Sequence, residues 1–140
     1  EQWEKLCADR SLIKNAIEEI VRLNTPIRAF SRYVAQDINV AGVDLAKDSR
    51  VLMVFGAANR DAEKFPDPNR FDIERSSRGH VGFGHGVHAC LGMHLARLEM
   101  TCLFNALADR VKRFEATGPV VPVINASIHA FASVPVKALV

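Results

Sequence analysis

A long segment in the middle of the chain shows no periodic apolar pattern, and this segment restricts the fold more than any other feature. From Gly56 to Cys90 the sequence is interrupted by prolines and glycines, at Pro66, Pro68, Gly79, Gly82, Gly84 and Gly86. A loop of this length is uncommon within a compact domain and is usually functional. We therefore expect regular elements on either side to hold a functional loop.

A helix is predicted before this loop, from about Ser11 to Asn24. Ser11 is a suitable N-cap, and the Thr25–Pro26 step should end the helix because a residue before proline avoids helical backbone angles. Apolar residues recur at helical spacing within it, at Leu12, Ala16, Ile17, Ile20, Val21 and Leu23. Residues 30–40 and a short apolar run at 51–55 then predict an antiparallel ribbon of two or three strands, with the second run buried.

Helical periodicity returns after the loop, from about Leu91 to Val111. Its apolar face should contain Leu91, Leu95, Leu98, Cys102 and Leu103. Residues 120–124 and 131–136 are strand-like and predict a terminal ribbon. The expected fold class is therefore α+β, in the order helix, ribbon, long loop, helix, ribbon, and residues 1–140 are expected to form a single unit.

Composition excludes several classes of protein. A formal net charge of +2 over 140 residues, without a basic run, does not favour nucleic-acid binding. No apolar stretch approaches the roughly 18 residues of a membrane span. Three cysteines, Cys7, Cys90 and Cys102, do not form a secreted disulfide framework, so we expect reduced thiols and a cytoplasmic location.

The end of the loop carries the most chemical information. Residues 83–92 read Phe-Gly-His-Gly-Val-His-Ala-Cys-Leu-Gly, so glycines precede a single cysteine at the expected start of a helix. Glycines let a backbone approach a large flat ligand closely. Free N–H groups and the helix dipole favour a thiolate at Cys90, and the amides of Leu91, Gly92 and Met93 are candidate donors to its sulfur.

This segment resembles the haem-binding signature of the cytochrome P450 family. The order Phe83, Gly86, Cys90, Gly92 reproduces the pattern Phe-x-x-Gly-x-x-x-Cys-x-Gly, and His88 matches its common form. The resemblance extends over about residues 3–137 and is nearest to soluble bacterial members. It implies that the chain is a C-terminal part of a mainly α-helical parent fold. It also implies that Cys90 is the axial ligand of haem b, iron protoporphyrin IX, with Phe83, Gly84, Gly86, His88, Leu91 and Gly92 around it.

A zinc-binding structural or interaction domain is the alternative from another class. His80, His85, His88, Cys90 and His94 are close in sequence and are residue types that bind zinc. The paired Cys-x-x-Cys element is missing, and so is the Cys-x-x-Cys-His of covalent c-type haem. A cysteine on its own is most often a small buried apolar residue.

The resemblance assigns roles to residues outside the loop as well. Glu19 and Arg22 resemble the family's Glu-x-x-Arg helix, and Arg70 is the candidate third member of a structural network. Arg32 and His88 match residues that reach the haem propionates. Two segments should border the substrate pocket, through Ile27, Ala29, Phe30, Ile124 and Ile128.

The implied activity is that of a haem-thiolate monooxygenase, which inserts one atom of O₂ into a small organic substrate. A hydrophobic or aromatic molecule is expected, with an aromatic acid as the suggested class. The electron donor should be a ferredoxin with an NAD(P)H-dependent reductase. Lys64, Arg75, Arg78, Arg97, Lys112 and Arg113 are candidates for its docking face. The family's oxygen-activating central helix has no counterpart here, so this chain alone should be inactive.

Overall fold

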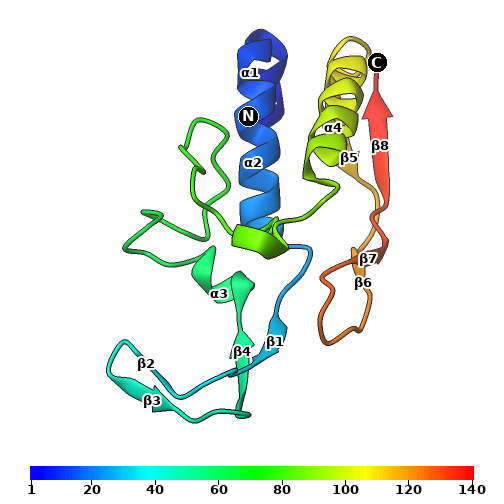
Figure 1. Cartoon of the computed structure of the whole chain (residues 1–140). Coiled ribbons are helices and arrows are strands. Elements are labelled where there is room, and N and C mark those ends of the chain that lie inside the picture. The colour runs from blue at the N-terminus through cyan, green and yellow to red at the C-terminus, as the bar shows by residue number, and fades with distance from the viewer.

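Helices α2 (Ile13–Asn24) and α4 (Met93–Ala108) pack against each other and frame the fold (Figure 1). The computed structural model describes all 140 residues. Helix α1 (Gln2–Ala8) and the 3₁₀ turn η1 (Arg10–Leu12) lead into α2. The order of helix, ribbon, loop, helix and ribbon predicted from the sequence is confirmed.

Side-chain hydrogen bonds mark the start of the η1–α2 segment and the end of α2. Ser11 lies inside the η1 turn, whose N-cap is Asp9: the Asp9 side chain accepts a hydrogen bond of 2.9 Å from the Ser11 amide. The N-cap of α2 itself is Leu12, which makes no side-chain capping hydrogen bond. The prediction of Ser11 as N-cap was therefore wrong, because a 3₁₀ turn precedes the α-helix. Thr25 ends α2 with a φ of 42°, and its hydroxyl donates to the Arg22 carbonyl at 2.6 Å.

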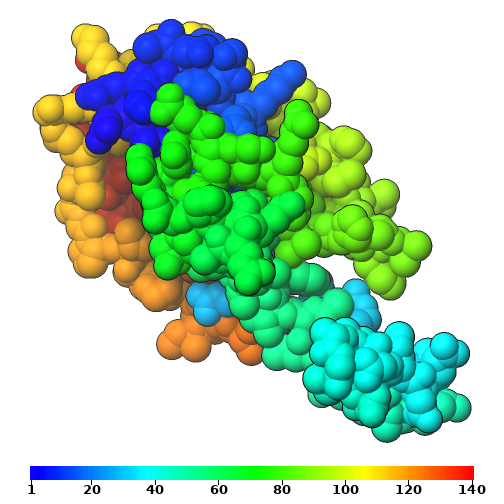
Figure 2. Space-filling view, turned by 90° about the vertical axis from the view of Figure 1, so that its left-hand side faces the viewer, coloured from blue at the N-terminus to red at the C-terminus, as the bar shows by residue number.

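Two separate two-stranded ribbons follow α2. Strands β1 (Phe30–Tyr33) and β4 (Arg50–Met53) pair antiparallel, and β2 (Ile38–Val40) pairs with β3 (Val43–Leu45). The β2–β3 hairpin projects from the body of the molecule (Figures 1 and 2). Strand β4 is not buried as predicted, since Leu52 is 65% exposed and no further layer covers the ribbon within this chain.

The chain ends in two more antiparallel ribbons. Strand β5 (Arg113–Ala116) pairs with β8 (Val136–Leu139), and β6 (Val121–Pro122) pairs with β7 (Phe131–Ser133). The predicted terminal ribbon is thus present, although β5 was not foreseen. Residues at the start of the chain meet this region: Trp3 packs edge-on against Phe114, and its indole N–H donates to the Val111 carbonyl at 3.1 Å.

The buried core lies between α1, α2, the long loop and one face of α4. Its fully buried members are Leu6, Ile13, Ala16, Ile17 and Ile73. Helix α4 contributes Met100, Phe104 and Ala108, which recur every four residues and therefore share a face.

The residues predicted to share an apolar face of α4 are not those that pack against the core of this chain. Leu95, Leu98 and Leu103 are each more than half exposed, and Leu91 is fully exposed. Helix α4 is apolar on most of its circumference, so spacing alone could not distinguish its inner from its outer face. No helix of the structure has both the length and the apolar character needed to cross a membrane.

Candidate functional site

Backbone hydrogen bonds close the loop that ends at Cys90 into a compact turn. Between α3 (Phe55–Ala58) and α4 its only helical element is the 3₁₀ turn η2 (Gly86–His88), drawn at the lower end of α2 in Figure 1. The Cys90 amide donates to the Phe83 carbonyl at 2.8 Å. Gly84 and Gly86 have φ values of 72° and 66°, in the region that favours glycine. The glycines therefore allow the turn that presents Cys90.

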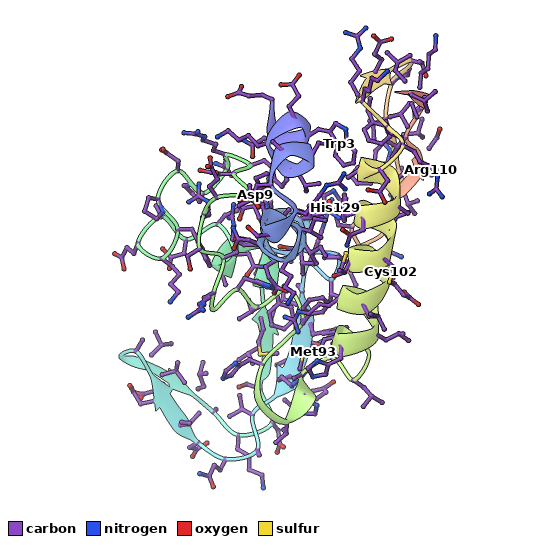
Figure 3. The ribbon with its side chains drawn as sticks, turned by 90° about the horizontal axis from the view of Figure 1, so that it is seen from above. Trp3, Asp9, Met93, Cys102, Arg110 and His129 are labelled. Atoms are coloured by element: carbon purple, nitrogen blue, oxygen red, sulfur yellow. The ribbon has the colours of Figure 1, made fainter.

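Cys90 lies before α4 and not on it. Gly92 is the N-cap of α4, and the helix begins at Met93, which is labelled in Figure 3 together with Cys102 further along. The Met93 amide donates to the Cys90 carbonyl at 3.2 Å, so it is not a donor to the sulfur as predicted. The amides of Leu91 and Gly92 donate to no backbone carbonyl. Two free N–H groups therefore remain beside the thiol.

The surroundings of Cys90 are open and apolar. The cysteine is a free thiol and is exposed. Val87 is 97% exposed and Leu91 is 100% exposed on either side of it. Exposed apolar residues around a free thiol are unfavourable in water, and they suit a large apolar ligand that would cover them.

Beside this loop, Glu18 binds two partners from distant segments. Its carboxylate accepts a bidentate pair of hydrogen bonds from Arg97 of α4, at 2.6 and 2.8 Å, and lies 2.9 Å from Nε2 of His80. The hydrogen bonds from Arg97 hold the pKa of Glu18 below its usual range. These side chains, with Phe83, line a groove of about 760 Å³ between α2, the loop and α4.

The neighbouring Glu19 belongs to a second, fully buried network. Arg22 donates to both of its carboxylate oxygens, at 2.7 and 2.8 Å, and both side chains have no exposed surface. Ser77 donates its hydroxyl to Glu19 at 2.6 Å. Burial alone would raise the pKa of Glu19, but hydrogen bonds from Arg22, Ser77 and the Asp72 amide outweigh it, so the pKa lies below its ordinary value.

The third side chain of the Glu19 network is Arg75, which corrects the assignment of Arg70. The Arg70 side chain is exposed, and only its carbonyl approaches Arg22, at 3.5 Å. Nε of Arg75 is buried and lies 3.3 Å from Glu19, without the alignment of a hydrogen bond. Turns in the loop aim Arg75 inward, where its guanidinium also donates to the carbonyls of Pro66 and Asp67.

The two segments expected at the substrate pocket lie side by side. Ile27 and Ile128 form an antiparallel bridge, and the Arg28 amide donates to the Ser127 carbonyl at 2.7 Å. Ile124 is fully exposed, Phe30 is 46% exposed and Ile128 is 44% exposed. Ala29 is half-buried in the same segment. The segments therefore present a partly uncovered apolar surface.

The two candidate propionate-binding residues, Arg32 and His88, are not linked to each other through any shared hydrogen-bond partner. Arg32 is half-buried on β1, and its guanidinium donates to the neighbouring Ser31 carbonyl at 3.0 Å. His88 is exposed at the end of η2. Both remain available to a ligand.

Comparison with known proteins identifies the family. Residues 3–133 match the family model described as Cytochrome P450. The chain belongs to the cytochrome P450 family. Its fold is correspondingly the C-terminal part of the P450 fold, as the sequence predicted.

Individual P450 relatives show the same similarity. Cytochrome p450 CYP199A2 of Rhodopseudomonas palustris is 41% identical over 98% of this chain and 33% of its own length. A steroid C26-monooxygenase of Rhodococcus jostii is 43% identical over 84% of this chain and 25% of its own length. The crystal structure of CYP109E1 from Bacillus megaterium in complex with corticosterone superposes with a TM-score of 0.91 and 32% identity, over 97% of this chain and 37% of that one. The chain thus spans between 25% and 37% of the length of these three relatives.

P450 membership implies a haem cofactor, and the residues present fit one. An exposed thiol, two free amides and uncovered apolar residues meet the needs of a large flat group bound through its metal. The zinc alternative is not supported, because no three His, Cys, Asp or Glu side chains come together to hold a metal ion. His80, one member of the proposed zinc cluster, is instead bound to Glu18.

The sequence did not reveal every residue of the site. The pair of Glu18 and Arg97 joins residues 79 positions apart, which no local motif could signal. Asn59, which is fully buried, accepts from the Val81 amide at 2.7 Å and donates to Thr25 at 2.9 Å. It therefore ties the long loop to the end of α2.

Proposed function

We propose that this chain is the haem-binding C-terminal part of a cytochrome P450 monooxygenase, and that residues 1–140 form one portion of a larger domain. The parent enzyme inserts one atom of O₂ into a small organic substrate. The observation that carries this proposal is the exposed Cys90 at the end of a glycine-rich turn, beside free amides. The monooxygenase names of relatives such as that of Rhodococcus jostii support it.

Each residue of the loop has a proposed role toward haem b. Cys90 ligates the iron as a thiolate, and the free amides of Leu91 and Gly92 stabilise its negative charge. Gly84 and Gly86 let the backbone lie against the macrocycle, and Phe83 packs beside it. When bound, the haem supplies the oxygen-activating redox chemistry, which the thiolate tunes.

An arginine and a histidine would hold the edge of the cofactor. Arg32 and His88 are proposed to bind the propionates, since a guanidinium and an imidazole are suitable donors to carboxylates. Neither side chain has a strong competing partner: Arg32 binds only a neighbouring carbonyl, and His88 is exposed.

The test uses the full-length parent protein. Its reduced CO complex should show the red-shifted Soret band of a thiolate-ligated haem, and Cys90→Ala should abolish this band. Cys102→Ala is the matched control, because Cys102 is also a free and exposed thiol but lies on α4. A red-shifted band that survives in Cys90→Ala would overturn the assignment.

A small hydrophobic or aromatic substrate, with an aromatic acid as the suggested class, is proposed to contact Ile27, Ala29, Phe30, Ile124 and Ile128. The support is the partly uncovered apolar surface that the two adjoining segments form. Ligand pockets are mostly apolar with few polar groups. Titration of the full-length enzyme with benzoates, terpenes and fatty acids should shift the haem spectrum with benzoates. A response to the other two classes alone would contradict the aromatic-acid proposal.

An acidic ferredoxin with an NAD(P)H-dependent reductase is the proposed electron donor, in a cytoplasmic setting. Two of the six candidate cations are no longer suitable, because Arg75 and Arg97 are bound to Glu19 and Glu18. Arg78 is an exposed residue of the loop itself, so the test uses a variant of Arg78. Arg78→Glu should slow reduction at low salt, whereas Lys47→Glu on the β3–β4 turn should not. Equal rates of reduction in the two variants would contradict the proposed docking face.

A further inference from the structure

Three segments that are distant in sequence meet at the carboxylate of Glu18. Arg97 comes from α4, seven residues after Cys90, and His80 comes from the loop ten residues before it. The Arg97 fork binds both carboxylate oxygens at 2.6 and 2.8 Å, and His80 shares one of them at 2.9 Å. We call Glu18, His80 and Arg97 the Glu18 clamp. It joins both sides of the Cys90 loop to α2.

The Glu18 clamp reaches Cys90 through Phe83. The guanidinium carbon of Arg97 lies 4.7 Å from the centre of the Phe83 ring, and the His80 ring lies 6.0 Å from it. The Phe83 carbonyl accepts the hydrogen bond from the Cys90 amide at 2.8 Å. A displacement of Phe83 would therefore move the backbone that presents the thiol.

His80 fixes the backbone on the other side of Phe83. Its Nδ1 accepts a hydrogen bond of 3.0 Å from the Gly82 amide, so the ring hydrogen lies on Nε2 and is donated to Glu18. A side chain at position 82 could not be accommodated, because a Cβ there would lie 2.6 Å from Val21 Cγ1. The loop is thus held tightly against α2 at this point.

The contacts of Arg97 require an arginine and not only a positive charge. The edge of a guanidinium can bind a carboxylate in a bidentate manner while its flat face covers an aromatic ring, and a lysine ammonium cannot do both. The clamp is partly shielded from water: the side chain of His80 is 5% exposed, and those of Glu18 and Arg97 are 28% and 34% exposed.

We propose that the Glu18 clamp positions Phe83, and through it Cys90, for ligation of the haem iron. Glu18, His80 and Arg97 are positioning residues, since none of them needs to touch the cofactor. The inference rests on the proposed function, because it concerns the geometry of Cys90 as a ligand. Residues that orient a metal ligand indirectly often change metal retention by about tenfold or more.

The experiment compares variants of the full-length haem protein well below their melting temperatures. Arg97→Lys keeps the charge but loses the fork and the stacking, and Glu18→Gln removes the carboxylate. Both should lower the fraction of the reduced CO complex with the red-shifted band, and should speed haem transfer to apomyoglobin about tenfold. Arg75→Lys is the control, because it perturbs the neighbouring Glu19 network without a contact to Phe83.

The outcomes separate the two proposals. A wild-type protein without the red-shifted band would overturn the proposed function itself. A wild-type band that Arg97→Lys and Glu18→Gln leave unchanged would overturn the role of the clamp alone. The same would follow if Arg75→Lys lost the band to the same extent, because the effect would then reflect general stability. If Glu18→Gln does not accumulate, Arg97→Lys and His80→Gln decide.

Discussion

Removal of Arg22 should destabilise the protein severely, because it leaves a buried carboxylate without its principal partner. Arg22 donates to both oxygens of Glu19 and, through Nη1, to the carbonyls of Asn59 and Pro68, at 2.7 and 2.9 Å. Its guanidinium also lies 5.0 Å from the centre of the Phe65 ring. Arg22→Ala removes all of these contacts from a position with no exposed surface.

The magnitude follows from what remains around Glu19. Loss of one partner from a buried ion pair costs about 3–5 kcal/mol. Two carbonyls also lose a donor, at about 1 kcal/mol each. The Ser77 hydroxyl, 2.6 Å from Glu19, the Asp72 amide, at 3.2 Å, and the Arg75 guanidinium, at 3.3 Å, partly offset the loss. We therefore expect a decrease of about 4 kcal/mol in the free energy of unfolding, against a typical total of about 5–15 kcal/mol.

Urea unfolding of the full-length protein, followed by circular dichroism, measures this change. Glu74→Gln is the control, since its ion pair with Lys5 is exposed to solvent and should contribute little to the free energy of unfolding. Adding Glu19→Gln to Arg22→Ala should restore about 1–2 kcal/mol, because it removes a buried carboxylate that has lost its principal partner. A loss in Arg22→Ala no larger than that of the control would refute the reasoning.

Two further predictions concern the attachment of the loop to α2. Because hydrogen bonds from Arg97 depress the pKa of Glu18, the stability it contributes should be present above the ordinary glutamate pKa of about 4.3 and be lost as the pH falls through the lower folded value. Thermal melts of wild type and Glu18→Gln should therefore converge in acid, and a constant gap would contradict this. Gly82→Ala should yield unstable, haem-poor protein, because its Cβ would lie 2.9 Å from the Val21 carbonyl oxygen. Gly42 has a positive φ, which Gly82 does not, but a Cβ at position 42 would meet nothing within 4 Å. Gly42→Ala should therefore cost only the strain of about 1–2 kcal/mol, and an equal loss in both variants would count against the argument.

The sequence predicted the elements whose signals are local. The apolar spacing of α2 and the Thr25–Pro26 stop gave its extent, and the helical turn before it displaced only the cap. Helix α4 was predicted too long at its start, because Cys90 and Leu91 belong to the closing turn and Gly92 is the N-cap. Its inner face could not be chosen, since apolar residues surround the helix.

The residues of the site likewise fall into those with a local sequence signal and those brought together only by packing. The Cys90 loop is a contiguous signature and could be found in the sequence. Arg70 was predicted as the third network member because its segment resembles the corresponding segment of the family, whereas the path of the turns places the guanidinium of Arg75 against Glu19. The pairing of Glu18 with Arg97 depends on how α2 packs against α4, and this packing has no sequence signal.

The adjacency of Glu18 and Glu19 has a consequence for insertions and deletions. Successive residues of an α-helix differ by about 100° around its axis. The carboxylate of Glu18 therefore faces Arg97 of α4, whereas the carboxylate of Glu19 faces Arg22 and Arg75. A substitution at exposed Lys14 would leave this arrangement intact. One extra or missing residue between Ile17 and Glu18 would turn both carboxylates away from their partners at once. We therefore expect homologous chains to vary freely in the length of the projecting β2–β3 hairpin and to keep the length of α2 constant.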